Sequence, residues 1–372
     1  MTAHCTVFDP MNSSAISSLH IIGSKGPGGA ENFYSRLVIA LDQAGSRVQV
    51  INPPNSHVAH ALGNSVKQTH PGMRSIYDPL SRWQIKQLIK REQPDIVQTY
   101  MGRATRLTHL RQGNGPVHVA RLGGYYNLKG YRHAHAWVGN TKGIVDYLVG
   151  NGLPHERVFH INNFVDLAID CDDDRIVAIK NELGIPSDAL LVCSIGRLHP
   201  NKAFDTLLKA FSRLPAELSG RPVHLLIAGD GDLKPALYSQ ARAIAIDSRV
   251  HWAGWQNDTD PYYHMADVFI CPSRHETLGN VILEAWAHHC PVISTSTQGG
   301  VELIENGHNG LLTPVDDVQA MTDVMLELLR ADPKQNLALA DNGLQTVRDR
   351  FSKKIIVNQY LSVYQRLIQN KS

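Results

Sequence analysis

The sequence predicts an α/β protein built from two doubly wound domains, with helices on both faces of parallel sheets. Three observations indicate this class. The 372 residues exceed what one hydrophobic core usually holds. Short apolar runs alternate with helical patterns, which is typical of βαβ units. The alternation also restarts once, after the acidic stretch DLAIDCDDDRI (166–176).

The first half alternates strands and helices up to about residue 164. The expected strands are 18–24, 47–53, 95–100, 117–124, 136–141 and 158–164. The expected helices are 30–45, 81–93 and 103–112. In the second half, strands are expected at 190–198, 224–232, 250–255, 267–273 and 291–296. Helices are expected there at 202–215, 233–246 and 281–289, with a terminal amphipathic helix at 351–369.

Composition excludes several classes of protein. Hydrophobic content of 43% and charged content of 19% are ordinary for a globular chain. No apolar run approaches the roughly 18 residues of a membrane span, and the N-terminus has no signal-peptide pattern, so we expect a cytoplasmic protein. The five cysteines stand singly, without zinc-site spacing, and Cys193 and Cys271 are expected in the core.

The net charge of +2 conceals an asymmetry between the halves. Residues 1–165 hold 17 Lys and Arg against 8 Asp and Glu, a balance of +9, and the remainder carries −7. A basic half favours contact with a polyanion or an anionic membrane surface. Chance drift in surface charge is the alternative.

Two loops have the composition of anion sites. GSKGPGGAE (23–31) joins a strand to a helix, and its glycines let the backbone approach a ligand at the helix N-terminus. A tight βα turn is the alternative, since the loop matches neither Walker A nor GxGxxG.

GRLHPNKAFD (196–205) places Arg197 after a strand and Lys202 before a helix, as in a pyrophosphate clamp. A surface ion pair and a solvated lysine are the alternatives there.

The stretch RHETLGNVILEAWAHHCPV (274–292) holds Glu276 and Glu284 eight positions apart. Helical geometry would bring the two carboxylates within roughly 80° of each other and about 12 Å apart along the axis. We expect the LGN amides to lie at a helix N-terminus, with a carboxylate on each side. Carboxylates beside an anion site suit neutral hydroxyls, so the pattern predicts a nucleoside diphosphate sugar as ligand.

Six motifs carry a resemblance to glycosyltransferase family 4, a family of retaining enzymes with the GT-B fold. In chain order they are GPGGAE, GRLHPNKAFD, IAGDGD, VHWAGW, CPSRHETLGNVILEAWA and PVISTSTQGGVELIENGHNGLLTPVDD. The resemblance covers nearly the whole chain, and ETLGNVILEAW is most similar to bacterial enzymes of lipopolysaccharide core and surface-polysaccharide assembly. We therefore expect an N-terminal acceptor domain at 1–170, a donor domain at 171–352, and a terminal helix at 353–372 that packs on the N-terminal domain.

The resemblance also implies roles for individual residues. Arg197 and Lys202 would bind the donor diphosphate and stabilise the leaving group in place of a metal, Glu276 would hold the donor sugar, and Glu284 the ribose. The implied catalytic residues are Glu276, Arg197 and Lys202. The implied donor-binding set is Gly28, Gly29, Gly196, Arg197, Lys202, Trp255, Glu276, Thr277, Leu278, Gly279, Asn280 and Glu284. No metal or other cofactor is expected, and DTD (258–260) is interpreted as a polar loop and cap rather than a metal motif.

One feature departs from the family pattern. Many relatives have a histidine in an HG motif near the catalytic centre of the N-terminal domain. The corresponding stretch here, VARLGGYYNLKGYRHAHAW, has Gly123 or Gly124 at that place. His118, His133 and His135 lie nearby and are interpreted as strand or surface residues. The group that activates the acceptor therefore stays unassigned.

The acceptor side is predicted from charge. Arginines can pair with phosphate or carboxylate while tyrosines flank sugar rings, so an anionic glycolipid or oligosaccharide is the expected acceptor. The candidate residues are Arg103, Arg106, Arg121, Tyr125 and Tyr126. SRWQIKQLIKR (81–91) has the composition of an interfacial helix and suggests peripheral contact with the inner membrane, with an ordinary covering helix as the alternative.

The prediction is thus a glycosyltransferase that moves a hexose or N-acetylhexosamine, from a UDP-sugar by preference, to a lipopolysaccharide-core or related precursor. The alternatives are a catalytically impaired nucleotide-sugar-binding protein and a GT-B enzyme of another kind, such as a nucleotide-sugar epimerase. Nucleic acid is not an expected partner, because the chain has no nucleic-acid motif.

Overall fold

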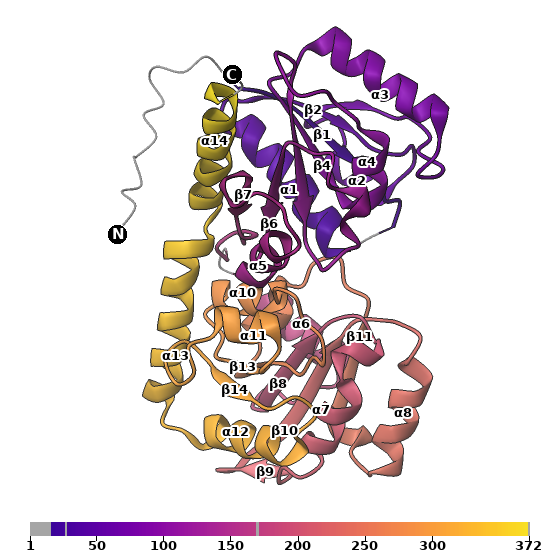
Figure 1. Ribbon diagram of the computed structural model, residues 1–372. Coiled ribbons are helices and arrows are strands. Elements are labelled where there is room, and N and C mark those ends of the chain that lie inside the picture. The colour runs from indigo at the N-terminus through magenta and orange to yellow at the C-terminus, as the bar shows by residue number, and fades with distance from the viewer. Residues whose placement is uncertain (1–15, 27, 169–170, 371–372) are drawn as a thin grey trace. The chain divides into compact units, whose positions relative to one another are not determined.

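The structure is a computed structural model that describes residues 16–26, 28–168 and 171–370. The chain divides into two units, each with its own core (Figure 1). Unit 1 runs to Phe164 and includes the C-terminal segment from Lys353, and unit 2 is Val165–Ser352. The N-terminal segment of unit 1 therefore ends at Phe164, six residues before the boundary expected at residue 170.

Unit 1 is a seven-stranded parallel sheet in the order β3-β2-β1-β4-β5-β6-β7. Its strands are β1 (Ser17–Ile22), β2 (Arg47–Ile51), β3 (Lys67–Thr69), β4 (Ile96–Tyr100), β5 (Val117–Leu122), β6 (Ala136–Gly139) and β7 (Val158–His160). Every residue of β4 and β5 is buried, as expected for a sheet that is covered on both faces.

Helices cover both faces of this sheet. One face packs on α1 (Gly29–Gln43), α2 (His57–Leu62) and the terminal α14 (Lys353–Gln369), which contributes six buried side chains to the unit 1 core. The other face packs on α3 (Pro79–Glu92), α4 (Met101–Leu107) and α5 (Lys142–Gly150). The helix expected at 103–112 is short and ends at Leu107.

Unit 2 repeats this architecture. Its strands are β8 (Leu190–Ile195), β10 (Arg221–Ala228), β11 (Val250–Gly254), β12 (Val268–Cys271), β13 (Val292–Thr295) and β14 (Leu311–Thr313). They run parallel in the order β11-β10-β8-β12-β13-β14, and the short β9 (Glu217–Leu218) pairs antiparallel with β10. Cys193 and Cys271 are buried in this unit's core, which confirms that prediction.

The helices of unit 2 pack in two layers. One layer holds α9 (Asp260–His264), α10 (Asn280–Ala287) and the π-helical turn η5 (Val347–Phe351). The other holds α7 (Phe204–Phe211), α8 (Lys234–Ala243) and α12 (Val318–Arg330). Remaining helices are α6 (Asp173–Leu183), α11 (Gln298–Leu303) and α13 (Pro333–Thr346). Within the described residues, no helix is long and apolar enough to cross a membrane.

Candidate active site

The topology of unit 2 places its most polar loops at one point of the sheet. From β8 the chain continues outward to β10 and β11, whereas β12, β13 and β14 continue in the opposite direction. The strands β8 and β12 are neighbours, so the loops that follow them leave the sheet side by side at its carboxyl edge. Such a switch point is where doubly wound sheets bind ligands.

The loop after β8 is held by the loop after β10. Gly196 N donates to Ala228 O at 2.9 Å, and Leu198 N donates to Asp230 O at 2.9 Å. A Cβ at Gly229 would overlap the Gly196 carbonyl, which explains why the AGDGD stretch has glycine at this position. The predicted donor residues Gly196 and Arg197 therefore lie on a backbone that the loop after β10 holds in place.

Lys202 and Glu276 meet at this switch point. Lys202 ends the short turn η3 (Pro200–Lys202), and its Nζ forms an ion pair with Glu276 Oε2, which also accepts from Ser273 Oγ at 3.3 Å. Burial disfavours the ammonium charge, but the Glu276 carboxylate outweighs burial and raises the pKa of Lys202 above its usual value. Arg197, which is exposed, adds a second cation to the same loop.

The loop after β12 leads into a helix that begins where the sequence predicts. α10 starts at Asn280, and Gly279 precedes it with φ +87°, a conformation that favours glycine. Its Cβ would also come within 2.9 Å of Ile282 Cδ1. The Glu276 carbonyl accepts from Gly299 N at 2.9 Å, so the QGG segment of α11 packs directly on this loop. Thr277 is half-buried and Leu278 is buried.

The helical argument for the two glutamates was wrong in one respect. Glu276 lies four residues before α10, so the angle and axial separation of an ideal helix do not apply to the pair. Glu284 lies in the second turn of α10, where it accepts from Tyr263 Oη at 2.8 Å. The two carboxylates thus have different partners: an ammonium and a serine for Glu276, and a buried phenol for Glu284.

The loop after β11 carries the remaining donor candidate. Trp255 is 56% exposed and donates from Nε1 to Asn257 Oδ1 at 3.2 Å. In the DTD stretch, Asp258 accepts from Asp260 N at 3.1 Å and pairs with Arg175 at 2.7 Å. The stretch is thus a polar turn before α9, in which Asp258 accepts from the first helical residue while the N-cap residue Thr259 makes no side-chain cap hydrogen bond. Among the described residues, no group of three His, Cys, Asp or Glu is placed to hold a metal ion.

The glycine loop of unit 1 also follows a switch point, because β1 and β4 are neighbours from which the sheet grows in opposite directions. α1 begins at Gly29, and the missing side chain of Gly28 leaves room for the buried Glu31 carboxylate, which would lie 2.5 Å from a Cβ there. A glutamate at the third helical position can reach back to the start of its own helix.

The predicted acceptor residues have different environments. Arg103 donates to Gly23 O at 2.9 Å and to Met73 O at 3.2 Å, so it clamps the loop after β1. Arg106 packs against Gly130. Tyr125 is exposed and contacts Tyr147 edge-on, and Tyr126 is half-buried and stacked on Tyr131.

Arg121 does not have the position of an acceptor-binding residue. It is 3% exposed, donates to Asn163 Oδ1 and to Tyr360 Oη, and lies over the Phe33 ring at 4.1 Å. These contacts join β5 to α14 inside unit 1. The physical reason is that a strand in a sheet covered on both faces has no exposed side, so a cation there must be paired internally.

The histidines near Gly123 and Gly124 form a separate cluster. His118 is fully buried and bonds Thr99 Oγ1 at 3.0 Å, while His109 and His133 stack at 3.9 Å. Burial, and then the neighbouring histidines, lowers the pKa of His118 well below its usual value. His118 is therefore a buried strand residue, as expected, rather than a surface base.

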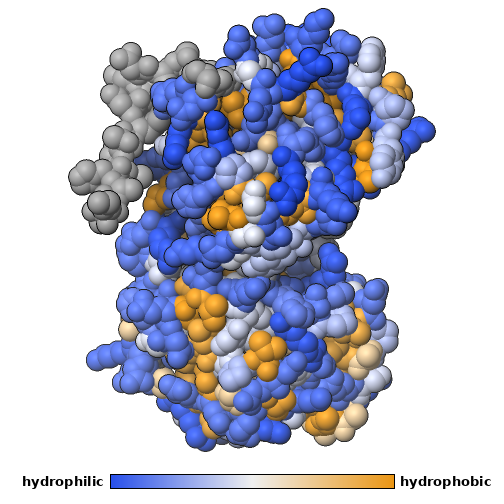
Figure 2. All heavy atoms as spheres, viewed as in Figure 1, coloured by the Kyte–Doolittle hydropathy of each residue, from blue (hydrophilic) through white to orange (hydrophobic). Residues whose placement is uncertain are grey.

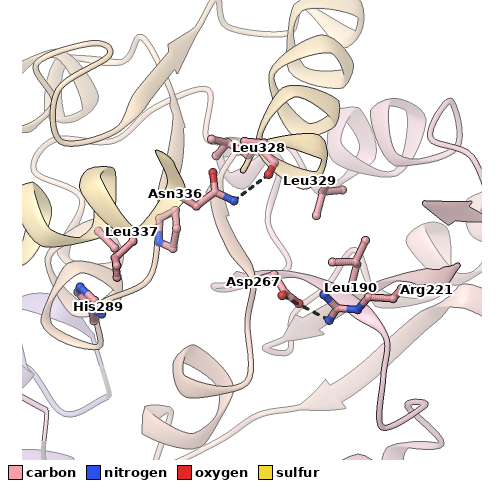
Figure 3. A pocket seen from close by; sticks show the side chains of 11 residues that line it. Leu190, Arg221, Asp267, His289, Leu328, Leu329, Asn336 and Leu337 are labelled. Atoms are coloured by element: carbon pink, nitrogen blue, oxygen red, sulfur yellow. Dashed lines mark hydrogen bonds and ion pairs between the residues drawn. The ribbon is translucent and has the colours of Figure 1, made fainter. Parts of the chain in front are cut away.

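A cavity of about 290 Å³ lies at the opposite, amino edge of the unit 2 sheet (Figure 3). Its floor is apolar, and its rim carries Arg221, which pairs with Asp267 at 3.6 Å, together with His289. Leu190 and Arg221 begin their strands, whereas the donor candidates follow the strand ends. This cavity is therefore not part of the candidate active site.

Sequence reasoning missed Arg274, which lies two residues before Glu276. Its guanidinium pairs with Asp205, in the first turn of α7, and with Asp316, in the loop after β14, at 2.8 Å each. It thereby connects the loop after β12 to both of these elements. The only local signal is an arginine directly after a strand end. The two aspartates lie 69 and 42 positions away along the chain.

The two parallel-sheet units have the architecture of the GT-B fold, and the Arg–Lys–Glu constellation lies at the switch point of unit 2. A solved glycosyltransferase from Rickettsia africae superimposes with a TM-score of 0.84 at 18% identity, over 96% of this chain and 100% of that one. Anabaena HepE in complex with UDP and glucose gives a TM-score of 0.80 at 19% identity, over 94% and 100%.

Sequence comparison assigns the family. Residues 27–169 match the model of Glycosyltransferase Family 4, and residues 189–331 match that of Glycosyl transferases group 1. The lipopolysaccharide core biosynthesis glycosyltransferase LpsE of Rhizobium meliloti is 34% identical over 90% of this chain and 95% of its own length. LpsD of the same organism is 26% identical over 91% and 95%. The chain belongs to glycosyltransferase family 4 and is a glycosyltransferase.

Proposed function

We propose that this enzyme transfers a hexose or N-acetylhexosamine, with retention of configuration, from a UDP-sugar to an anionic precursor of the lipopolysaccharide core. The Lys202–Glu276 ion pair at the switch point of unit 2, with Arg197 beside it, is the observation that carries the proposal. It combines a cation for a diphosphate with a carboxylate for sugar hydroxyls.

The ion pair has a direct role in donor binding. A bound diphosphate competes with Glu276 for the Lys202 ammonium, and the released carboxylate can then accept hydrogen bonds from the donor sugar. Lys202 and Arg197 would stabilise the negative charge that develops on the leaving diphosphate. Glu284 has one oxygen bonded to Tyr263, which orients the carboxylate so that its second oxygen can accept from a ribose hydroxyl.

Relatives support the choice of donor and acceptor. LpsE and LpsD, which this chain resembles over nine tenths of its length, are lipopolysaccharide core biosynthesis enzymes. HepE, which shares the fold, has been solved with UDP-glucose. The two cations of the β8 loop provide the charge that a divalent ion supplies in other transferases, so we propose that no metal is required.

A matched pair of variants tests the clamp. Lys202→Ala leaves the Glu276 carboxylate unpaired beside the diphosphate, so UDP affinity and kcat/KM for the UDP-sugar should fall by about a hundredfold or more. The double variant K202A/E276Q removes that carboxylate charge and should bind UDP more tightly than K202A alone. Unchanged kcat/KM in K202A would contradict the assignment.

Transfer assays separate the remaining possibilities. We expect the wild-type protein to transfer sugar from a UDP-sugar to lipopolysaccharide-core acceptors, with the anomeric configuration retained in the product. Donor binding without turnover on any core acceptor would instead indicate an impaired nucleotide-sugar-binding protein. Conversion of the donor into its epimer without an acceptor would indicate an epimerase.

We further propose that α3 and the turn before it contact the anionic surface of the inner membrane, on its cytoplasmic face. Tyr77, Leu80 and Trp83 are 84%, 62% and 58% exposed, an unusual concentration of large apolar side chains within seven residues. Lys86 and Lys90 lie three and seven positions after Trp83, on the same side of the helix. Figure 2 shows apolar and hydrophilic spheres intermixed over the part of unit 1 where Figure 1 places α3.

Charge complementarity favours a membrane over a neutral surface. Residues 74–91 carry five basic side chains against one acidic side chain, Asp78, which caps α3. Aromatic side chains beside lysines are typical of interfacial helices, and the attraction to anionic lipid weakens with salt.

Vesicle sedimentation tests this contact. The wild-type protein should bind vesicles that contain anionic phospholipid better than neutral vesicles. Binding should weaken between 50 and 500 mM salt, because the Debye length shortens over this range from roughly 14 Å to about 4 Å. L80S/W83S should lose binding, whereas L337S, which removes a 50% exposed leucine of unit 2, should retain it. Equal binding to both vesicle types would contradict the proposal.

A further inference from the structure

Three loops that leave the carboxyl edge of the unit 2 sheet converge on one side chain, Arg274. They are the loop after β8, which carries Lys202, the loop after β12, which carries Glu276, and the loop after β14, which carries Asp316. Arg274 belongs to the second loop and contacts both of the others.

All five N–H donors of the Arg274 guanidinium are engaged. Nη1 and Nη2 donate to the two Asp205 oxygens at 2.9 and 2.8 Å. Nε donates to Asp316 Oδ2 at 2.8 Å, and Nη2 lies 2.8 Å from Asp316 Oδ1. Nη1 also donates to Pro200 O at 2.8 Å, and Nη2 to Thr206 Oγ1 at 3.0 Å. The two parallel hydrogen bonds to Asp205, with the Nε hydrogen bond to Asp316, fix the plane of the guanidinium as well as its position.

The backbone of Arg274 strengthens this connection. Its N–H donates to Asn201 O at 2.7 Å, and the next residue, His275, donates to the same carbonyl at 3.3 Å. Thr206 Oγ1 donates to Asp316 Oδ1 at 2.7 Å, which closes a ring of polar contacts around the guanidinium. The hydrogen bond from Arg274, followed by the bond from Thr206 and the Arg274 charge, lowers the pKa of Asp316.

Two backbone conformations depend on this arrangement. Ala203, directly after Lys202, has φ +50°, and Asp316 has φ +59°, although neither residue is glycine. A left-handed conformation is unfavourable for a non-glycine residue and persists only where its surroundings hold it. The contacts of Arg274 lie on either side of Ala203, at Pro200 and Asp205, and on Asp316 itself.

We propose that Arg274, with Asp205 and Asp316, is a positioning residue that holds Lys202 and Glu276 in register for the donor diphosphate. Lys202 lies between Pro200 and Asp205, and Glu276 lies two residues after Arg274. The guanidinium therefore fixes the two loops whose charged ends form the ion pair. This inference rests on the proposed donor site, but the placement of the loops can be tested without a ligand.

The first test uses hydrogen exchange on the ligand-free protein. Arg274→Met removes the fork while it keeps a long side chain, so amides at 201–203 and 276–279 should exchange faster than in the wild type. Amides of the β8 and β12 strands should be unchanged. Arg221→Met is the matched control, because it removes an arginine that pairs with Asp267 at the amino edge of the same sheet (Figure 3). Unchanged exchange in both loops of R274M would overturn the proposal.

The second test measures UDP binding. R274M should weaken UDP binding by between about tenfold and a hundredfold, as expected when a binding group is displaced by an ångström or so. R274K, which keeps the charge without the fork, should recover only part of the loss, and R221M should bind as the wild type does. The loss in R274M/K202A should be smaller than the product of the single losses, since Arg274 acts through Lys202.

The outcomes distinguish this inference from the proposed function. A wild-type protein that binds no UDP or other nucleoside diphosphate would refute the donor site, and loop exchange in R274M would still decide the positioning role. UDP binding by R274M with wild-type affinity, or a double variant whose losses multiply in full, would refute the positioning role while the donor site stands.

Discussion

Substitution of His20 is expected to change how strongly acid destabilises unit 1. His20 lies in the centre of β1 and is 0% exposed, with Nδ1 2.9 Å from Tyr100 Oη and Nε2 3.1 Å from Ser18 Oγ. Burial lowers the pKa of His20 from 6.5 to about 3, because the imidazolium loses its hydration there. The ring is therefore neutral in the folded protein at any pH above about 3.

The sign and size of the effect follow from linkage. Between pH 6.5 and 3 the unfolded chain binds a proton at His20 that the folded chain excludes, so stability is complete above pH 6.5 and falls as pH decreases. At pH 5 the unfolded ring lies 1.5 units below its pKa of 6.5, which corresponds to about 2 kcal/mol. The folded pKa lies two units lower still, so the unfolded pKa alone sets this figure. It is a substantial part of the roughly 5–15 kcal/mol that stabilises a typical domain.

The assay compares the wild type with His20→Gln, whose side chain does not titrate. Urea unfolding at pH 7 and pH 5, with hydrogen exchange of β1 peptides to identify the unit 1 transition, gives the free energy of unfolding of each protein. The wild type should lose about 2 kcal/mol more than H20Q over this interval. His155→Gln, at an exposed position, should retain the wild-type dependence. Equal losses in the wild type and H20Q would refute the reasoning.

Three further predictions concern other parts of the molecule. Arg121→Met should lower the free energy of unfolding of unit 1 by about 3 kcal/mol, because Asn163 and Tyr360 lose a buried charged partner, and urea unfolding measures this loss. The KM for acceptor should change little in the folded variant, and an acceptor KM that rises without loss of stability would restore the acceptor role of Arg121. Gly229→Ala should weaken UDP binding in calorimetry, since its methyl would displace the Gly196 carbonyl, and wild-type affinity would contradict this packing. Transfer activity should survive EDTA at millimolar concentration, whereas strict dependence on an added divalent ion would contradict the proposed metal-free mechanism.

The alternation of apolar runs predicted most of the strands correctly because the strands are largely buried. The expected strands from 18–24 to 291–296 all correspond to strands of the two sheets. Between residue 296 and the terminal helix, no helix or strand was predicted. This region nevertheless contains α12, which has Met321, Met325 and Leu328 on its buried side. That region alternates polar turns with short elements such as α11 and β14, whose patterns are too short to be distinctive.

The candidate site was predictable to the extent that it lies within single loops. In GRLHPNKAFD and at the LGN helix start, the position of each residue follows from the strand or helix next to it in the sequence. Lys202 and the beginning of α10 could therefore be placed from sequence. Arg274 could not be recognised, because its partners Asp205, in α7, and Asp316, in the loop after β14, come from distant segments that only the strand order brings together. Its ion pairs are a consequence of topology rather than of any local pattern.

In the basic half of the chain, contacts between distant segments also decide which of the predicted cations are available to a ligand. The excess of +9 in residues 1–165 is a property of composition, and composition does not distinguish cations that the fold itself requires. Arg121 pairs inside the core and Arg103 clamps the loop after β1, so these two serve the structure of unit 1. Lys86 and Lys90, in contrast, are exposed on α3 beside Trp83, where a charged surface can reach them. We therefore expect that removal of both α3 lysines would weaken binding to anionic vesicles, whereas removal of Arg121 would destabilise unit 1 instead.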